Sequence, residues 1–200
     1  SAAGLQRRQW SGSPGEFRAL GIVSSTGGPA ALIELLGALG PDFPLPILLV
    51  QHMTASFLEG FATWLGGVCP FRVTVVADGC IPAAHSVHMA PAERHLRLEG
   101  GRLRLDTGNP VCFQRPSGTV LFQSMAQSLG AGVLGVLLTG MGEDGAAGLL
   151  DVRRSGGYTI AEDETTAVVY GMPAAAVKMG AVCESLPLPA IGTRILELVT

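Results

Sequence analysis

Residues 19–51 read ALGIVSSTGGPAALIELLGALGPDFPLPILLVQ. This stretch opens with an apolar run at 19–23 and closes with a second run at 45–50. Continuous apolar runs of this length are typical of strands that are covered on both faces of a parallel sheet. Between them, leucines recur at the three- and four-residue spacing of one helix face: Leu32, Leu35, Leu36 and Leu39. The stretch therefore predicts a strand-helix-strand unit.

The same alternation continues to the end of the chain. A helix follows residue 50, and its aromatic residues Phe57, Phe61 and Trp64 are expected in the core. Further strands are expected at 72–77, 133–138, 158–161 and 181–184, and further helices at 119–129, 145–154, 173–179 and 190–199. This order predicts an α/β fold with a doubly wound, mostly parallel sheet and helices on both faces.

One region departs from this pattern. Between about 79 and 115 the chain has short alternating segments, 86–90, 95–98 and 102–105, around the Gly100-Gly101 pair. Apolar and polar alternation around a Gly-Gly turn is typical of a β-hairpin. We therefore expect the region to form a hairpin inserted between the strand-helix units.

Composition excludes several classes of protein. Of the 200 residues, 48% are hydrophobic and 14% are charged, with a net charge of -3, whereas disordered chains combine low hydrophobicity with high net charge. No run approaches the roughly 20 apolar residues that a membrane span needs. The 13 basic residues are scattered, so neither nucleic acid nor an anionic membrane is an expected partner. No secretory signal is visible, and we expect a cytoplasmic protein.

The first 17 residues are expected to be a linker or tail, because they mix Ser, Gly, Pro and Arg without apolar periodicity. The folded domain is expected at 18–200. The four cysteines are irregularly spaced, without a C-x-x-C pair, and the histidines of the hairpin region have no neighbour at metal-ligand spacing. We therefore predict buried reduced thiols, no metal site and no cofactor.

Polar residues cluster where three predicted strands end. Ser25 follows the first strand, His52 follows the second, and Asp144 follows the strand at 133–138. In a doubly wound sheet, the carboxyl ends of parallel strands line a crevice where ligands bind. A serine, a histidine and a carboxylate are the parts of a hydroxyl nucleophile, its base and the group that orients the base.

Each of these residues also has an alternative interpretation. The glycine-rich turn at 25–28 is also compatible with a tight connection or a phosphate cradle, although it lacks both the G-x-G-x-x-G pattern and a Walker lysine. His52 could simply cap a helix. Asp144, followed by Gly145, could cap the helix that runs to Arg154.

Taken together, these segments resemble the catalytic domain of the CheB family, the protein-glutamate methylesterases of bacterial chemotaxis. The resemblance extends over about residues 19–199. It is carried by Ser25-Thr26-Gly27-Gly28, Gln51-His52-Met53, Ala90-Pro91 with Arg94-His95, Arg115-Pro116-Ser117, Leu138-Thr139-Gly140-Met141-Gly142 with Asp144-Gly145-Ala146-Ala147-Gly148, and Gly171-Met172-Pro173.

The resemblance implies hydrolysis of glutamate γ-methyl esters on cytoplasmic helices of chemoreceptors, with release of methanol and related deamidation of glutamines. It implies that Ser25 is the nucleophile, His52 the general base and Asp144 the orienting acid. The amides near Thr26 and Met141 are the expected oxyanion donors, since both lie in strand-end turns. The expected partners are methylated receptor helices and, if residues 1–17 are the tail of a linker, an N-terminal receiver domain in the full-length protein; a free-standing relative of the family is the alternative.

Two positions depart from the family pattern. Glu143 stands where the family usually has Asn, which places a second carboxylate beside Asp144. Thr119 replaces an acid that often follows the Arg-Pro-Ser segment. Two other functions remain open from the residues alone: an esterase or amidase with a small-molecule substrate, and a non-catalytic module that binds at the same crevice.

Overall fold

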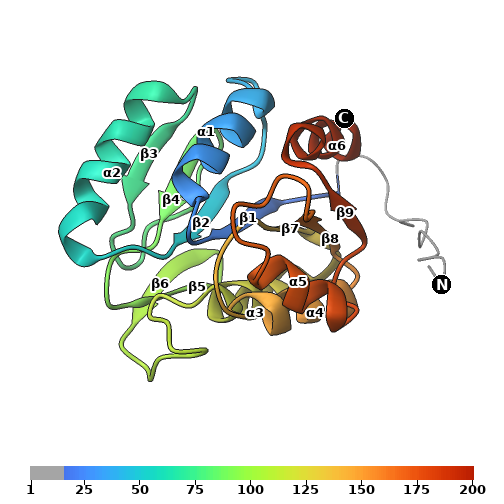
Figure 1. The fold of residues 1–200 in the computed structure, drawn as a ribbon. Coiled ribbons are helices and arrows are strands. Elements are labelled where there is room, and N and C mark those ends of the chain that lie inside the picture. Colours follow the sequence, from blue (N-terminus) through green and yellow to red (C-terminus); the bar gives the residue numbers. More distant parts are fainter. Residues whose placement is uncertain (1–15) are drawn as a thin grey trace, which may run out of the picture.

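The computed structural model describes residues 16–200 and shows a seven-stranded sheet between two layers of helices (Figure 1). The predicted tail at 1–17 lies outside the described residues except for Glu16 and Phe17. The strands are β1 (Ala19–Ser24), β2 (Ile47–Gln51), β3 (Arg72–Val75), β4 (Ser86–Met89), β7 (Val133–Leu137), β8 (Tyr158–Glu162) and β9 (Glu184–Leu186). Their order is β3-β4-β2-β1-β7-β8-β9, and every neighbouring pair is parallel. The doubly wound α/β fold is confirmed.

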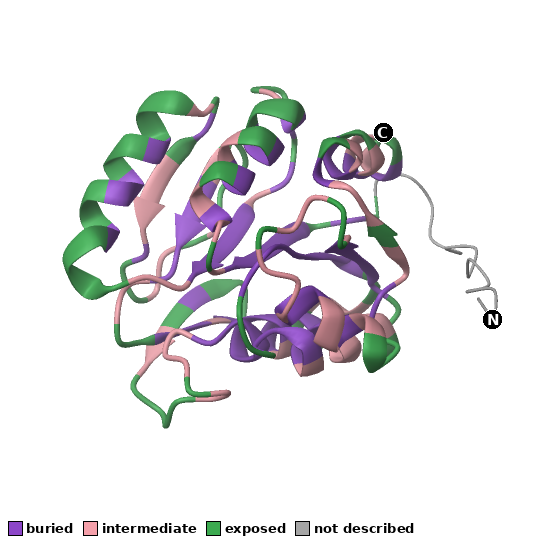
Figure 2. Cartoon of the chain, in the orientation of Figure 1, coloured by how far each residue is buried: buried purple, intermediate pink, exposed green. Residues whose placement is uncertain are grey.

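One helical layer consists of α1 (Gly28–Leu39), α2 (Ala55–Val68) and α6 (Leu188–Val199). The other consists of α3 (Gly118–Leu129), α4 (Ala146–Arg154) and α5 (Met172–Lys178), together with a short 3-10 turn at Gly130–Gly132. Successive residues of β1 point to opposite layers. Leu20 packs in a first apolar cluster, on the side of α1, α2 and α6, and Ala19 packs in a second apolar cluster, on the side of α3, α4 and α5. Burial on both faces explains why β1, β2 and β7 are continuous apolar runs, and Figure 2 shows these central strands buried.

The predicted hairpin forms from β5 (His95–Glu99) and β6 (Arg102–Asp106), which pair antiparallel around Gly100-Gly101. The assignment of 86–90 to this region was wrong, because β4 lies in the main sheet between β2 and β3. Its alternation does not mark a solvent-facing side: His88 is buried and its Nε2 accepts a 3.0 Å hydrogen bond from the Ala83 N–H. A buried polar residue whose hydrogen bond is satisfied can occupy an interior strand.

Two other expectations need correction. The last strand is at Glu184–Leu186 rather than 181–184. Phe57 and Trp64 are 69% and 47% exposed, whereas Phe61 is 8% exposed and lies in the core. Helix α2 buries Leu58, Phe61, Ala62 and Leu65, so its buried stripe lies one residue away from the positions of Phe57 and Trp64.

No helix within 16–200 is both long enough and apolar enough to cross a bilayer. The same residues contain no group of three His, Cys, Asp or Glu side chains placed to hold a metal ion. The four cysteines are only partly buried and form no disulfide.

Candidate active site

Three adjacent strands carry the candidate residues to one edge of the sheet. Ser25 follows β1, His52 follows β2, and Asp144 lies in the loop after β7. The chain winds outward from β1 in one direction through β2, and from β7 in the other through β8. The candidate residues therefore lie at the topological switch point, where the connections diverge to opposite halves of the sheet and where ligands bind in many open α/β proteins.

Asp144 and His52 are hydrogen-bonded, with His52 Nε2 2.7 Å from Asp144 Oδ2. The His52 side chain is 7% exposed and the Asp144 side chain is 2% exposed. Within the described residues, no hydrogen bond or ion pair joins the exposed Glu143 to His52. Of the two neighbouring carboxylates, Asp144 is therefore the one that contacts the imidazole.

Asp144 also lies against the N-terminus of α3. It accepts hydrogen bonds from Ser117 Oγ at 2.7 Å, the Gly118 N–H at 2.7 Å and the Thr119 N–H at 3.2 Å. Burial acts to raise the pKa of this carboxyl, but the hydrogen bonds from His52, Ser117 and Gly118 outweigh burial and hold the pKa below its ordinary value. Asp144 is therefore an anion with its other acceptor sites occupied.

The helix-capping interpretations of Asp144 and His52 do not describe this geometry. The N-cap of α4 is Gly145, in a left-handed conformation, and Asp144 contacts the N-terminus of α3 instead. The N-cap of α2 is Thr54, and the His52 ring is bonded to Asp144.

The second ring nitrogen of His52 is an unusual atom. Nδ1 is buried and has no hydrogen-bond partner within residues 16–200. Because the Asp144 carboxylate accepts from Nε2–H, Nδ1 carries the free lone pair in this tautomer. A buried basic nitrogen without a donor is suited to accept a proton from a bound group or a neighbouring hydroxyl.

The turn that presents Ser25 is fixed on several sides. The Ser25 N–H donates to the Thr139 carbonyl at 3.0 Å. Gln51 Nε2 donates to the carbonyls of Ser25 and His52 at 2.9 and 3.0 Å, while Ser24 Oγ donates to Gln51 Oε1. The buried Gln51 therefore ties the serine turn to the histidine turn. Sequence reasoning missed this role, and the only signal for it was the position of Gln51 directly before His52.

Gly28 makes room for this network. A Cβ atom at this position would lie 2.0 Å from Gln51 Oε1 and 2.9 Å from Ser24 Oγ. A side chain here would displace the Gln51 amide group. Glycine at this position therefore allows the Gln51 side chain to approach the backbone of the turn closely. The sequence alone did not identify this role for the turn.

The two candidate oxyanion donors lie in turns beside the serine. Thr26 is exposed, and its carbonyl accepts a 2.9 Å hydrogen bond from Thr139 Oγ1. Met141 is 69% exposed and follows Gly140, where an added Cβ would lie 2.7 Å from the Ser25 Cβ. In the part of the chain that is described, neither the Thr26 N–H nor the Met141 N–H donates a hydrogen bond. Both are free to bind an anionic oxygen.

Thr119, one of the departures from the family pattern, has a structural part in the site. Its Oγ1 accepts a 2.9 Å hydrogen bond from the Gly145 N–H, and its own N–H donates to Asp144. The threonine therefore holds the turn that carries the acid.

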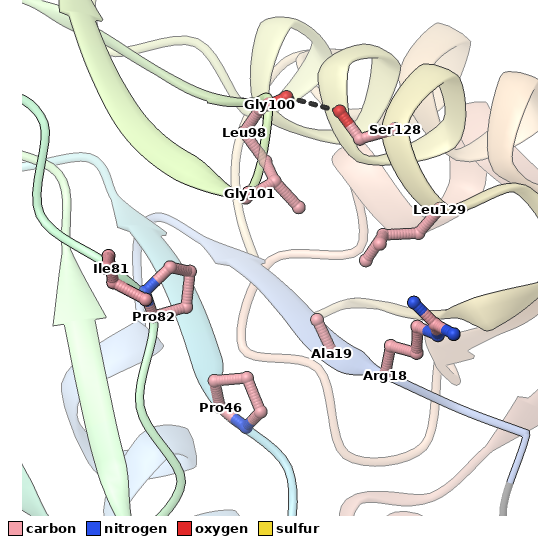
Figure 3. Close-up of a pocket in the computed structure, with 10 residues that line it drawn as sticks. All are labelled: Arg18, Ala19, Pro46, Ile81, Pro82, Leu98, Gly100, Gly101, Ser128 and Leu129. Carbon is pink, nitrogen blue, oxygen red and sulfur yellow. Dashed lines mark hydrogen bonds between the residues drawn. The ribbon is translucent and has the colours of Figure 1, made fainter.

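A separate apolar pocket of about 290 Å³ lies at the opposite end of the strands. Figure 3 shows Arg18 and Ala19 at the start of β1, Pro46 before β2, and Leu129 at the end of α3 around it. This pocket contains none of the candidate catalytic residues. The geometry of the polar groups locates the candidate site.

Comparison with known proteins agrees with this fold. A model of the CheB methylesterase family matches residues 20–195. A protein-glutamate methylesterase/protein-glutamine glutaminase of Paramagnetospirillum magneticum is 56% identical over 187 residues, which cover 94% of this chain and 53% of that protein. The protein-glutamate methylesterase FrzG of Myxococcus xanthus is 42% identical, over 93% of this chain and 56% of that protein.

A solved structure gives the same result. The CheB methylesterase catalytic domain of Thermotoga maritima matches with a TM-score of 0.87 at 34% identity, over 92% of this chain and 99% of that chain. The present chain spans about half the length of the curated relatives it matches. Since the family match extends over most of the sequence and the fold agrees throughout, this chain belongs to the CheB methylesterase family.

Proposed function

We propose that this chain hydrolyses glutamate γ-methyl esters on cytoplasmic chemoreceptor helices, and deamidates glutamines of such helices, with Ser25, His52 and Asp144 as catalytic residues. The observation that carries the proposal is the 2.7 Å bond from His52 Nε2 to Asp144, which leaves a buried Nδ1 without a hydrogen-bond partner among residues 16–200, at the end of the strand beside Ser25. The names of the relatives, methylesterase and glutaminase, support the same two reactions.

In the proposed mechanism, His52 Nδ1 takes the proton of Ser25 Oγ as the oxygen attacks the ester carbonyl. The carbonyl electron pair moves onto its oxygen, which the N–H groups of Thr26 and Met141 bind. When the carbonyl re-forms, the methoxy group leaves and takes the proton from the imidazolium, giving methanol and an acyl-serine. Water then repeats the sequence and releases the glutamate carboxylate.

Asp144 acts through charge and orientation in this scheme. It keeps the Nε2–H tautomer, so that Nδ1 is the base, and it stabilises the imidazolium that forms. Each oxyanion donor is expected to contribute about 3–4 kcal/mol to the barrier reduction, as in other acyl-transfer enzymes.

We further propose that 1–17 is a linker or tail, that 18–200 is the methylesterase domain, and that a receiver domain precedes it in the full-length protein. The greater length of the relatives supports this division. The receptor helices that we propose as substrates lie in the cytoplasm, which is where the enzyme would then act.

The test compares the wild type with Ser25→Ala on two substrates: a nitrophenyl ester, and receptor membranes carrying isotopically labelled methyl esters. The wild type should hydrolyse the ester and release methanol, and Ser25→Ala should do neither at an unchanged melting temperature. Ser155→Ala, at an exposed serine after α4, is the matched control and should behave as the wild type. Ester hydrolysis without methanol release would favour a small-molecule esterase, and no turnover of either substrate would favour a binding module.

A further inference from the structure

A second buried carboxylate lies close to the serine turn, outside the proposed chemistry. Glu162, the last residue of β8, is 1% exposed. Its Oε1 accepts a 2.9 Å hydrogen bond from the Thr139 N–H, and its Oε2 accepts a 2.9 Å bond from Thr166 Oγ1. No ion pair joins it to a cation within 16–200. A buried carboxyl group without a cation is costly unless hydrogen bonds satisfy its oxygens, and both Glu162 oxygens have such a partner here.

The side chain of Glu162 takes the place of a backbone acceptor at the end of a strand. The β7–β8 ladder ends at the pair Leu137 and Ala161, and Thr139 lies two residues beyond that pair. Its N–H is buried, and a buried N–H without an acceptor would cost about 1–3 kcal/mol. Glu162 therefore defines where the backbone of Thr139 lies after the sheet has ended.

Thr139 in turn holds the backbone on both sides of the nucleophile. Its carbonyl accepts from the Ser25 N–H at 3.0 Å, and its Oγ1 donates to the Thr26 carbonyl at 2.9 Å. A shift of Thr139 would consequently move both the serine and the amide proposed to bind the oxyanion. Misplacement of reacting groups by about 1 Å can cost about 100-fold in rate.

We infer that Glu162 is a positioning residue for Ser25, acting through the backbone and hydroxyl of Thr139. The inference rests on the proposed role of Ser25 as the nucleophile. It requires the acceptor geometry of the Glu162 side chain and not its negative charge. A glutamine retains an oxygen for the Thr139 N–H and can donate its amide to Thr166 Oγ1, whereas an aspartate keeps the charge but is one methylene too short.

The experiment compares Glu162→Gln, Glu162→Asp and Glu162→Ala in nitrophenyl ester hydrolysis, at a temperature where each is folded by circular dichroism. We expect kcat to fall about 10- to 100-fold in the alanine variant and about 10-fold in the aspartate variant, with KM changed less than about twofold. The glutamine variant should retain kcat within about threefold. If the alanine variant does not fold, the test is whether kcat is lower in Glu162→Asp than in Glu162→Gln, as we expect.

Glu184→Ala is the control for a loss of stability alone. Glu184, on edge strand β9, accepts hydrogen bonds from Tyr158 and from Arg194 Nε, and neither of these two partners belongs to the serine turn. This variant should lower the melting temperature while kcat stays near the wild-type value. The inference is overturned if the aspartate variant is more active than the glutamine variant, or if the Glu162 variants lose no more kcat than Glu184→Ala at equal loss of melting temperature.

Hydrogen exchange at the Ser25 amide gives a readout that does not depend on turnover. Exchange should be faster in Glu162→Ala than in Glu184→Ala and near the wild-type rate in Glu162→Gln, because the acceptor of the Ser25 N–H has moved only in the first variant. Equal exchange in the two alanine variants would overturn the inference. A wild type that exchanges as expected but hydrolyses no ester would instead contradict the proposed function.

Discussion

At the scale of single residues, Asp144 serves two parts of the molecule at once. The same carboxylate orients the His52 ring and accepts the N–H groups that open helix α3. A helix N-terminus carries partial positive charge, so an anion there is stabilised, and the helix is stabilised in return. The acid of the proposed mechanism is therefore also a structural residue, unlike Ser25.

Asp144→Asn should lower both activity and stability. The new amide group would either place its own N–H against an N–H of helix α3 or favour the wrong tautomer of His52. We therefore expect kcat to fall by about 10⁴-fold. The free energy of unfolding should fall by about 1.5–3 kcal/mol, because hydrogen bonds to a buried charge are lost. Urea unfolding measures the second effect. Ser25→Ala is the comparison, and equal stability of the two variants would contradict the capping role.

Glu162 should make stability depend on pH. Burial raises the pKa of this carboxyl, and the neighbouring charges of Asp163 and Glu34 raise it further, against smaller lowering by the hydrogen bonds from Thr139 and Thr166. The folded state thus keeps a proton that the unfolded chain releases near its ordinary pKa of about 4.3. The associated stability is present below that pH and is lost as pH rises through the folded-state value.

Glu162→Gln removes this titration. The variant should gain stability relative to the wild type as pH rises from about 4 to 7, and urea midpoints measured at both pH values test this. A wild type that instead gains stability over the variant with rising pH would show that the sign of the shift is wrong.

At the scale of elements, the start of α1 depends on a glycine that accommodates the Ser24–Gln51 pair. Gly28→Ala should cost about 1–3 kcal/mol, since the added Cβ overlaps Gln51 Oε1 and must displace it. Gly37, on the same helix, has no atom within 4 Å of an added Cβ, so Gly37→Ala should add about 0.5–1 kcal/mol through helix propensity. The melting temperatures of the two variants test this difference. Equal changes would contradict the overlap of the added Cβ with Gln51.

Helix α2 shows that position on the helix face, rather than residue type, decides burial. Phe61→Ala should cost about 3–4 kcal/mol, because that ring is 8% exposed in the first apolar cluster. Phe57→Ala should change the free energy of unfolding by less than about 1 kcal/mol, since its ring is 69% exposed. Urea unfolding compares them, and a large loss at Phe57 would show that its ring is covered in solution.

At the scale of the whole molecule, the proposed division into a linker and a methylesterase domain predicts autonomous activity. The three proposed catalytic residues all lie within residues 16–200, so this chain should hydrolyse a nitrophenyl ester without any activator. Adding a small-molecule phosphodonor should leave the rate unchanged. A rate that depends on the phosphodonor would count against the proposed division, in which the receiver domain that would accept the phosphate lies outside 18–200.

Local sequence determined much of this molecule. Apolar runs and leucine spacing predicted the parallel sheet and its helices, because strand and helix periodicities are properties of neighbouring residues. The same pattern predicted that Ser25, His52 and Asp144 follow strands, and parallel strands bring such residues to one edge.

Only the tertiary structure decided the rest. It placed β4 inside the main sheet, set β1 between β2 and β7, and brought Asp144 to the N-terminus of α3 rather than α4. It also assigned Gln51 and Glu162 their contacts with the serine turn. These outcomes depend on pairs of residues far apart in the chain, and local periodicity carries no information about which distant strand or helix a side chain will meet.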